Sequence, residues 1–237
     1  HFILYRLFMQ NYNKSTIFSE SHYKFIDRIV KNSRAKFFNF IKSKVNFKNI
    51  NSYLDVGTTE DEHHESSNYL NKRFDFIKKH NSISDQKIKN NRFSNILQKT
   101  ITGNFSQNEI DTIRSDFVIS NATIEHVGSF DNQEKMIDNM IKLSNKIIVI
   151  QTINRFFPIE THTKLPFLHF LPKKIHRIIL KLLGYKYYSL EENLNLLSYY
   201  EMINILKKFE NKIDYKIYRI FTFGFFSNIL VICNKKK

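Results

Sequence analysis

The sequence predicts an α/β fold with a doubly wound, mostly parallel sheet. Two observations lead to this prediction. Short apolar runs typical of buried strands alternate with amphipathic, helix-like segments over most of the chain. The last two strand-like runs lie too close together for a full helix between them, so they should pair as an antiparallel hairpin. At this length, residues 1–237 are expected to form a single domain.

The chain is expected to begin with a helical extension over residues 1–48. Apolar residues recur there at helix-like spacing among Lys and Arg, as at Ile29 and Phe37. Residues 2–9 are apolar, but the run is short and Arg6 interrupts it, so no secretory signal is expected. No run reaches the roughly 20 apolar residues that a membrane span requires.

The strand-like runs cover residues 52–57, 79–85, 95–101, 116–120, 146–151, 214–220 and 226–233. Segments 68–76 and 133–143 are predicted to be helices between them. The run at 79–85 is polar, so its assignment depends on the alternating pattern around it. Asp85 at its end could bind ribose hydroxyls, as in nucleotide-binding βαβ units, or could cap a turn.

Residues 155–208 are predicted to form a helical, substrate-side insertion before the last two strands. All three prolines of the chain fall within residues 152–172, together with His162 and His169. An irregular aromatic loop of this kind often carries function on a rigid scaffold. A basic amphipathic helix over 173–183 follows, and then one or two helices over 189–208.

Composition restricts the partners and the compartment. The formal net charge is +15, which favours anionic partners. Lys, Asn and Ile are abundant everywhere and no arginine-rich tract is present, so a nucleic-acid partner is not expected. Cys233 is the only cysteine and lies in an apolar run. The chain therefore has no disulfide framework and no thiolate metal site, as suits the cytoplasm.

Residues 115–128 contain the main candidate site. Three apolar residues, Phe117 to Ile119, predict a strand that is covered on both faces. Polar residues follow at once, including Glu125 beside His126. Ligands of open parallel sheets bind just beyond the carboxyl ends of strands, so this cluster is a site hypothesis. In the alternative, Glu125 caps the next helix and His126 lies on its surface.

The first strand ends at Gly57 and leads into an acidic turn over residues 58–65. A dinucleotide site needs three glycines and a helix N-terminus that is free to hold a pyrophosphate. The second and third glycines are missing here, and carboxylates would repel a phosphate. A cationic ligand that bears a sulfonium and an ammonium would be tolerated.

Together these segments resemble class I S-adenosylmethionine-dependent methyltransferases, in particular the type 11 group. The matching segments are L-D-V-G (54–57), D-F-V-I-S-N-A-T-I-E-H-V-G (116–128) and I-V-I-Q-T-I-N-R-F-F-P-I-E-T-H-T (148–163). The resemblance covers residues 50–235. It implies a Rossmann-like, seven-stranded sheet that ends in an antiparallel hairpin, and S-adenosyl-L-methionine as the cofactor.

The resemblance also implies residue roles. Asp55 and Gly57 would lie by the methionine part of the cofactor, and Asp85 would bind the ribose. Thr102 and Gly103 would border the adenine. Asn121 and Ala122 would line the cofactor after the fourth strand, and Glu125 would support that loop. The chain departs from the family at Thr59, where a second glycine is usual, and at Thr102, where an acidic residue is frequent. Some quinone-ring O-methyltransferases hold a metal with an extra Glu three residues before the Glu-His pair. Ala122 occupies that position here, so no metal is predicted.

Methyl transfer from a sulfonium is an in-line displacement, so the protein mainly positions the acceptor and removes its proton. Histidine suits that task near neutral pH. His162 is the first candidate base because Glu160 could orient it. His126 and His169 are the others, although each could equally be structural.

The expected reaction is O-methylation of a saccharide or a lipid-linked glycan intermediate of the cell envelope. RNA or a small metabolite is the alternative acceptor, and a non-catalytic module with this fold is a further alternative. The Asn/Asp-Pro-Pro-Tyr motif of many nucleic-acid methyltransferases is absent, which argues against RNA. The helix over 173–183 could rest on the inner face of an anionic membrane, or it could pack on the domain. The oligomeric state stays open.

Overall fold

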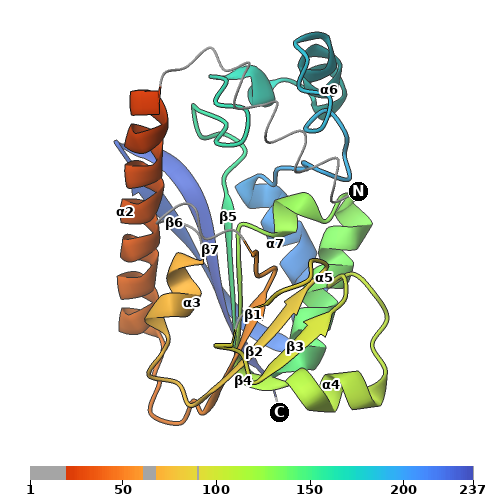
Figure 1. Ribbon diagram of the computed structural model, residues 1–237. Helices are drawn as coiled ribbons and strands as arrows, with labels where there is room; N and C mark the ends of the chain where they lie inside the picture. Colours follow the sequence, from red (N-terminus) through yellow and green to blue (C-terminus); the bar gives the residue numbers. More distant parts are fainter. Residues whose placement is uncertain (1–19, 61–67, 90, 237) are drawn as a thin grey trace. The chain divides into compact units, whose positions relative to one another are not determined.

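The computed structural model describes residues 20–60, 68–89 and 91–236 (Figure 1). The chain divides into two compact units, residues 1–45 with 61–70 and residues 46–60 with 71–237. In the first unit, α2 (Glu20–Lys44) is a helix of 25 residues. The predicted N-terminal helical extension is therefore confirmed over residues 20–44, and residues 1–19 lie outside the described residues.

The second unit contains the predicted seven-stranded sheet, in the order β3-β2-β1-β4-β5-β7-β6. Its strands are β1 (Ser52–Val56), β2 (Lys79–Ser84), β3 (Asn95–Gln98), β4 (Ser115–Asn121), β5 (Ser144–Ile153), β6 (Ile213–Thr222) and β7 (Phe225–Lys235). Strands β1 to β5 are parallel, and β7 runs antiparallel to both β5 and β6. The doubly wound sheet and its final hairpin are confirmed. The order reverses between β1 and β4, the point where such sheets bind ligands.

The remaining elements are α3 (Tyr69–Arg73), α4 (Gln107–Ile113), η1 (Ile124–His126), α5 (Phe130–Leu143), η2 (Leu168–Phe170), α6 (Lys173–Leu182) and α7 (Tyr199–Lys207). α4 was not predicted. The helix begins with a capping box. The Ser106 side chain accepts a hydrogen bond from the backbone N–H of Glu109, and the Glu109 side chain accepts one from the backbone N–H of Ser106. The helix predicted within residues 189–208 is confined to α7. None of the helices in the described ranges is both long and apolar enough to cross a bilayer.

The central strands of the sheet are buried on both faces, as predicted for β4, whereas the edge strands β3 and β6 are partly exposed. Leu54 and Val118 face a core that includes α4, α5 and α7 (Figure 1). Their neighbours Tyr53 and Phe117 point to the opposite face, because successive side chains of a strand alternate. There the two rings lie 5.9 Å apart and pack with Phe74. Two apolar layers therefore fix the sheet and the ends of its strands.

β2 is polar yet buried because its side chains have partners. Asn81 donates to the carbonyl oxygen of Ile113 and to Ser115 Oγ. Ser82 and Ser84 donate to the side chain and the backbone oxygen of Thr58. Burying polar groups is tolerated when they are hydrogen-bonded, so β2 is a true interior strand.

Cys233 should be chemically silent in the folded protein. It is buried in β7, and burial raises the pKa of its thiol to about 12. We expect no reaction with Ellman's reagent at pH 8 in native buffer, and one thiol per chain after unfolding in guanidinium chloride, since only a thiolate reacts. A native sample that reacts as fast as free cysteine would contradict the placement of β7.

Candidate functional site

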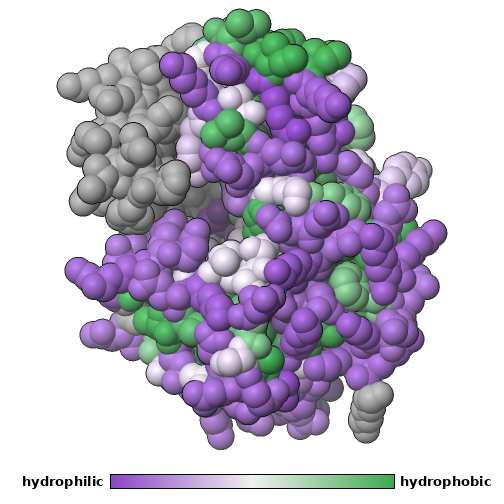
Figure 2. Space-filling model, turned by 90° about the vertical axis from the view of Figure 1, so that its right-hand side faces the viewer, coloured by the Kyte–Doolittle hydropathy of each residue, from purple (hydrophilic) through white to green (hydrophobic). Residues whose placement is uncertain are grey.

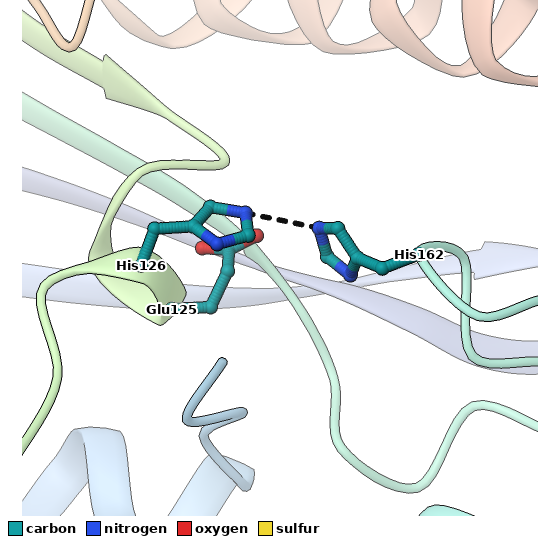
Figure 3. Close-up of side chains that lie close together, drawn as sticks. All are labelled: Glu125, His126 and His162. Atoms are coloured by element: carbon teal, nitrogen blue, oxygen red, sulfur yellow. Dashed lines mark hydrogen bonds between the residues drawn. The ribbon is translucent and has the colours of Figure 1, made fainter. Parts of the chain in front are cut away.

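The candidate site lies where the strand order reverses, beyond the carboxyl ends of β1 and β4. The register pairs Val56 with Ser120, so the two strands end side by side. Figure 3 shows that Glu125 and His126 come from η1, whereas His162 comes from the loop after β5. The segment after β4 and a loop predicted from its prolines therefore contribute to the same cluster.

Gly57 turns the chain at the end of β1. Its φ is +86°, and its N–H donates to the carbonyl oxygen of Ile83. A Cβ at this position would lie 2.3 Å from Thr123 Oγ1, and that hydroxyl itself donates to the carbonyl oxygen of Val56. Both the backbone angle and the close approach require glycine. Contact of Gly57 with a cofactor stays a prediction.

Asp55 is buried, and its carboxylate accepts hydrogen bonds from other side chains of the protein. Oδ2 accepts from Thr58 Oγ1 (2.6 Å) and Asn71 Nδ2 (3.2 Å), and Oδ1 accepts from the Tyr53 hydroxyl (3.2 Å). Burial raises the pKa of Asp55 although these hydrogen bonds oppose the shift. Asp55 therefore shapes the turn after β1, and its direct contact with a ligand stays a prediction.

The predicted ribose and adenine residues follow the ends of neighbouring strands. Asp85 is exposed directly after β2. Thr102 and Gly103 form a turn beyond β3, and Asn139 fixes this turn by donating to the carbonyl oxygens of Ile101 and Gly103. These residues lie where the resemblance puts them along the chain, and their binding roles are untested.

Asn121 and Ala122 form the step from β4 into η1. Ala122 has a φ of +56°, and its N–H donates to the carbonyl oxygen of Gln151. Asn121 Oδ1 is buried and has no partner within residues 20–60, 68–89 and 91–236. An unpaired buried amide oxygen is costly, so Asn121 is suited to accept a hydrogen bond from a ligand.

Glu125 is 0% exposed. Its Oε2 accepts from Thr152 Oγ1 (2.9 Å), and its backbone oxygen accepts from the N–H of Asn195. Its Oε1 has no partner in the described part of the chain. The alternative that Glu125 caps the next helix is wrong, because the cap of α5 is Ser129, whose Oγ accepts from the N–H of Asn132.

His126 and His162 contact each other, with 3.0 Å between their Nε2 atoms (Figure 3). His126 Nδ1 lies 2.7 Å from the carbonyl oxygen of Asn193, and His162 Nδ1 lies 2.5 Å from Glu160 Oε1. A carbonyl and a carboxylate can only accept, so both Nδ1 atoms carry protons. In neutral rings the two Nε2 atoms would then present lone pairs to each other, and one shared proton relieves this repulsion.

The carboxylate of Glu160 sets the charge on this pair. Burial alone would lower the pKa of His162, but Glu160 outweighs burial and raises it. The pKa of Glu160 is held far below its usual range by His162 and by two backbone N–H groups, despite burial. For His126, burial and then the charge of His162 lower the pKa. A proton shared between the two Nε2 atoms is therefore held more strongly by His162 than by His126.

His169, the third candidate base, has different contacts. Its Nε2 donates to the carbonyl oxygen of Phe157 (2.6 Å), and its ring centroid lies 6.3 Å from that of His176. Burial lowers its pKa. The structure brings two of the three predicted histidines together, and a catalytic role for His169 stays a prediction.

Three residues that hold this cluster were not identified from the sequence: Thr152, Asn193 and Asn195. Thr152 directly follows the clearest strand-like run, so its place at a carboxyl end could have signalled it. Asn193 and Asn195 lie in a stretch that was predicted to be helical. They act through an irregular backbone, for which the sequence pattern gives no signal.

Similarity to known proteins is found in structure but not in sequence. No protein-family model matches the chain, and no curated protein sequence does. A magnesium protoporphyrin IX methyltransferase from Synechocystis, solved with bound SAH, matches with a TM-score of 0.51, 9% identity, and coverage of 94% of this chain and 90% of that one. The N-methyltransferase NodS from Bradyrhizobium japonicum, also solved with SAH, matches with a TM-score of 0.51 and 10% identity, and the match covers 88% of each chain. An O-methyltransferase family protein from Burkholderia thailandensis matches with a TM-score of 0.53 and 8% identity, and the match covers 90% of this chain and 58% of that one.

These likenesses extend over most of the chain at very low identity. They show that the chain has the fold of class I S-adenosylmethionine-dependent methyltransferases, as the sequence predicted. The matched proteins include both N- and O-methyltransferases, so the fold leaves the acceptor open.

The two reasons for glycine at position 57 can be separated with a matched control. Gly184 has the same φ of +86°, but nothing lies within 4 Å of its missing Cβ. Gly184→Ala should lower the free energy of unfolding by about 1–2 kcal/mol through backbone strain. Gly57→Ala should lower it by about 1–3 kcal/mol more, because the methyl group collides with Thr123. Urea unfolding measures both, and equal losses would contradict the close approach.

Proposed function

We propose that this protein transfers a methyl group from S-adenosyl-L-methionine to a hydroxyl oxygen of a small-molecule or glycan acceptor. The observation that carries the proposal is the cluster of Glu125, His126 and His162 at the reversal of the sheet order. The fold supports the cofactor, and the cluster supports acceptor chemistry. RNA and a non-catalytic module remain the alternatives.

The residues present suit the cofactor. Asp85 offers an exposed carboxylate for ribose hydroxyls, and Asn121 Oδ1 is a buried acceptor in need of a donor. The carboxylate of Asp55 already accepts hydrogen bonds from Thr58 and Asn71, so the turn at Gly57 would fit the cofactor by its shape and would not offer it a free carboxylate. When bound, S-adenosyl-L-methionine supplies an electrophilic methyl group whose leaving group is a neutral thioether.

The residues of the cluster would bind and orient the acceptor and remove its proton. Glu160 fixes the ring of His162, and the Asn193 carbonyl fixes that of His126. A proton shared by the two rings would have to leave before either Nε2 could accept the proton of the acceptor. The ring of Tyr188 lies 5.7 Å from that of His162, and an aromatic face beside the cluster supports a sugar-like or ring-shaped acceptor.

We also propose a peripheral contact of α6 with the inner face of an anionic membrane, which would place the protein in the cytoplasm. Ile175, Ile178 and Leu182 share one face of α6 by their spacing and are all exposed, Leu182 by 80%, and the exposed Leu171 lies just before the helix. Figure 2 shows hydrophobic residues gathered at the top of the molecule, where α6 lies. The exposed Lys174 and Lys181 add positive charge, as interfacial helices do.

Calorimetric titration with S-adenosylhomocysteine tests the cofactor proposal. We expect binding by the wild type, and about 10- to 100-fold weaker binding by Asp85→Ala, because a charged hydrogen-bond acceptor for the ribose is lost. Asp111→Ala, which removes an exposed carboxylate on α4, is the matched control and should bind like the wild type. No heat from a folded wild-type sample would favour the non-catalytic module.

Vesicle sedimentation tests the membrane proposal. The wild type should pellet with phosphatidylserine-rich vesicles and not with phosphatidylcholine alone. Lys174→Gln and Lys181→Gln should each reduce partitioning about fivefold, and Ile178→Ser/Leu182→Ser should abolish it. Phe223→Ser, which removes an exposed aromatic residue elsewhere, should leave it unchanged. Sedimentation that none of the α6 variants alters would contradict the assignment.

A further inference from the structure

We propose that Glu125, His126 and His162 form a zinc site whose open position binds the acceptor hydroxyl. Each residue offers one ligand atom, and the three atoms lie within 4.8 Å of one another. The consequence for methyl transfer rests on the proposed function, whereas the zinc site itself rests on the geometry alone.

The two imidazoles already have the arrangement of metal ligands. Their Nε2 atoms face each other at 3.0 Å, and both Nδ1–H groups are donated outward, to the Asn193 carbonyl and the Glu160 carboxylate. Metal-bound histidines almost always donate their second N–H to such an oxygen, which fixes the tautomer and the ring orientation. Two Nε2 lone pairs 3.0 Å apart repel each other unless a positive charge lies between them. A proton or a metal cation can provide that charge.

Glu125 supplies the negative ligand. It is fully buried, Thr152 donates to its Oε2, and its Oε1 has no partner among the described residues. Leaving a buried carboxylate oxygen unpaired is costly. A cation between this oxygen and the two Nε2 atoms would satisfy all three atoms at once.

The donor set suits zinc or iron(II), and zinc is the ion that we propose. Two histidines and one carboxylate, with no thiolate, form the ligand set of catalytic zinc sites, which keep a fourth position open for water or substrate. The prediction of no metal rests on position 122, where alanine replaces a glutamate, and on the interpretation of His63 and His64 as part of a solvated acidic segment; it does not weigh Glu125, His126 and His162 together. His162 is 36 residues away from His126 in sequence and reaches the same place from the loop after β5.

Zinc between the two Nε2 atoms would remove the repulsion between their lone pairs while both imidazoles stay neutral. An acceptor hydroxyl at the open position would have its pKa lowered, as zinc-bound water does. Its O–H bond would break with loss of the proton to solvent, and the oxygen lone pair would form the new bond to the methyl carbon as the carbon–sulfur bond breaks.

The test measures zinc by mass spectrometry after EDTA treatment, reloading with zinc chloride and desalting. We expect one zinc per wild-type chain, and cobalt loading should give the visible absorption of a four-coordinate ion. Glu125→Gln, His126→Gln and His162→Gln should weaken zinc binding by about 100-fold or more, and Glu160→Gln by about 10- to 100-fold. Circular dichroism checks that each variant is folded.

Two controls locate the ion. His169→Gln removes a buried histidine that is not a proposed ligand. His63→Ala/His64→Ala removes two histidines of the acidic stretch of sequence 58–65. Both variants should keep one zinc. Zinc that is absent from the wild type, or that persists in folded ligand variants, would overturn the site.

Binding of S-adenosylhomocysteine, measured in the same samples, separates this inference from the proposed function. If the cofactor product binds while zinc does not, the zinc site fails and the methyltransferase proposal stands. If zinc binds while the cofactor product does not, the zinc site stands and the methyltransferase proposal fails.

Discussion

The parallel pairing of β1 with β4 is the constraint on which the site depends. It brings two chain segments, more than sixty residues apart, to the same edge of the sheet. Gly57 must then turn sharply, because Thr123 occupies the space beside it. The same turn of chain after β4 carries Asn121 and Glu125 to the point where the sheet order reverses. The positive φ of Gly57 and the backbone strain at Ala122 therefore occur where two strands end side by side.

The cluster beyond that edge is dominated by buried charge. Glu125 and Glu160 are both enclosed, and the imidazoles of His126 and His162 lie beside them. The two carboxylates place negative charge where water reaches poorly. Such an arrangement is costly unless a cation completes it. This explains how an otherwise basic protein can present a site for a sulfonium or a metal ion.

The fold was predictable from the sequence because most of its strands are apolar and the helices between them have regular spacing. β2 was the weakest prediction, since its burial depends on Asn81, Ser82 and Ser84 finding partners in distant segments. α4 was missed although its capping box is visible in the sequence. Positions such as Asp85 and Asn121 were predictable along the chain because the resemblance fixes them relative to strand ends.

The contact between His126 and His162 was not predictable, because an irregular loop decides it. Both residues were candidates as separate bases, each judged by its neighbours in sequence. The sequence indicates Glu160 as an orienting group, but the same carboxylate also raises the pKa of His162, which opposes the role of free base. The property that matters belongs to the pair and not to either residue. Two rings held by outward hydrogen bonds and facing one point act as a binding site for positive charge, whichever ion or proton occupies it.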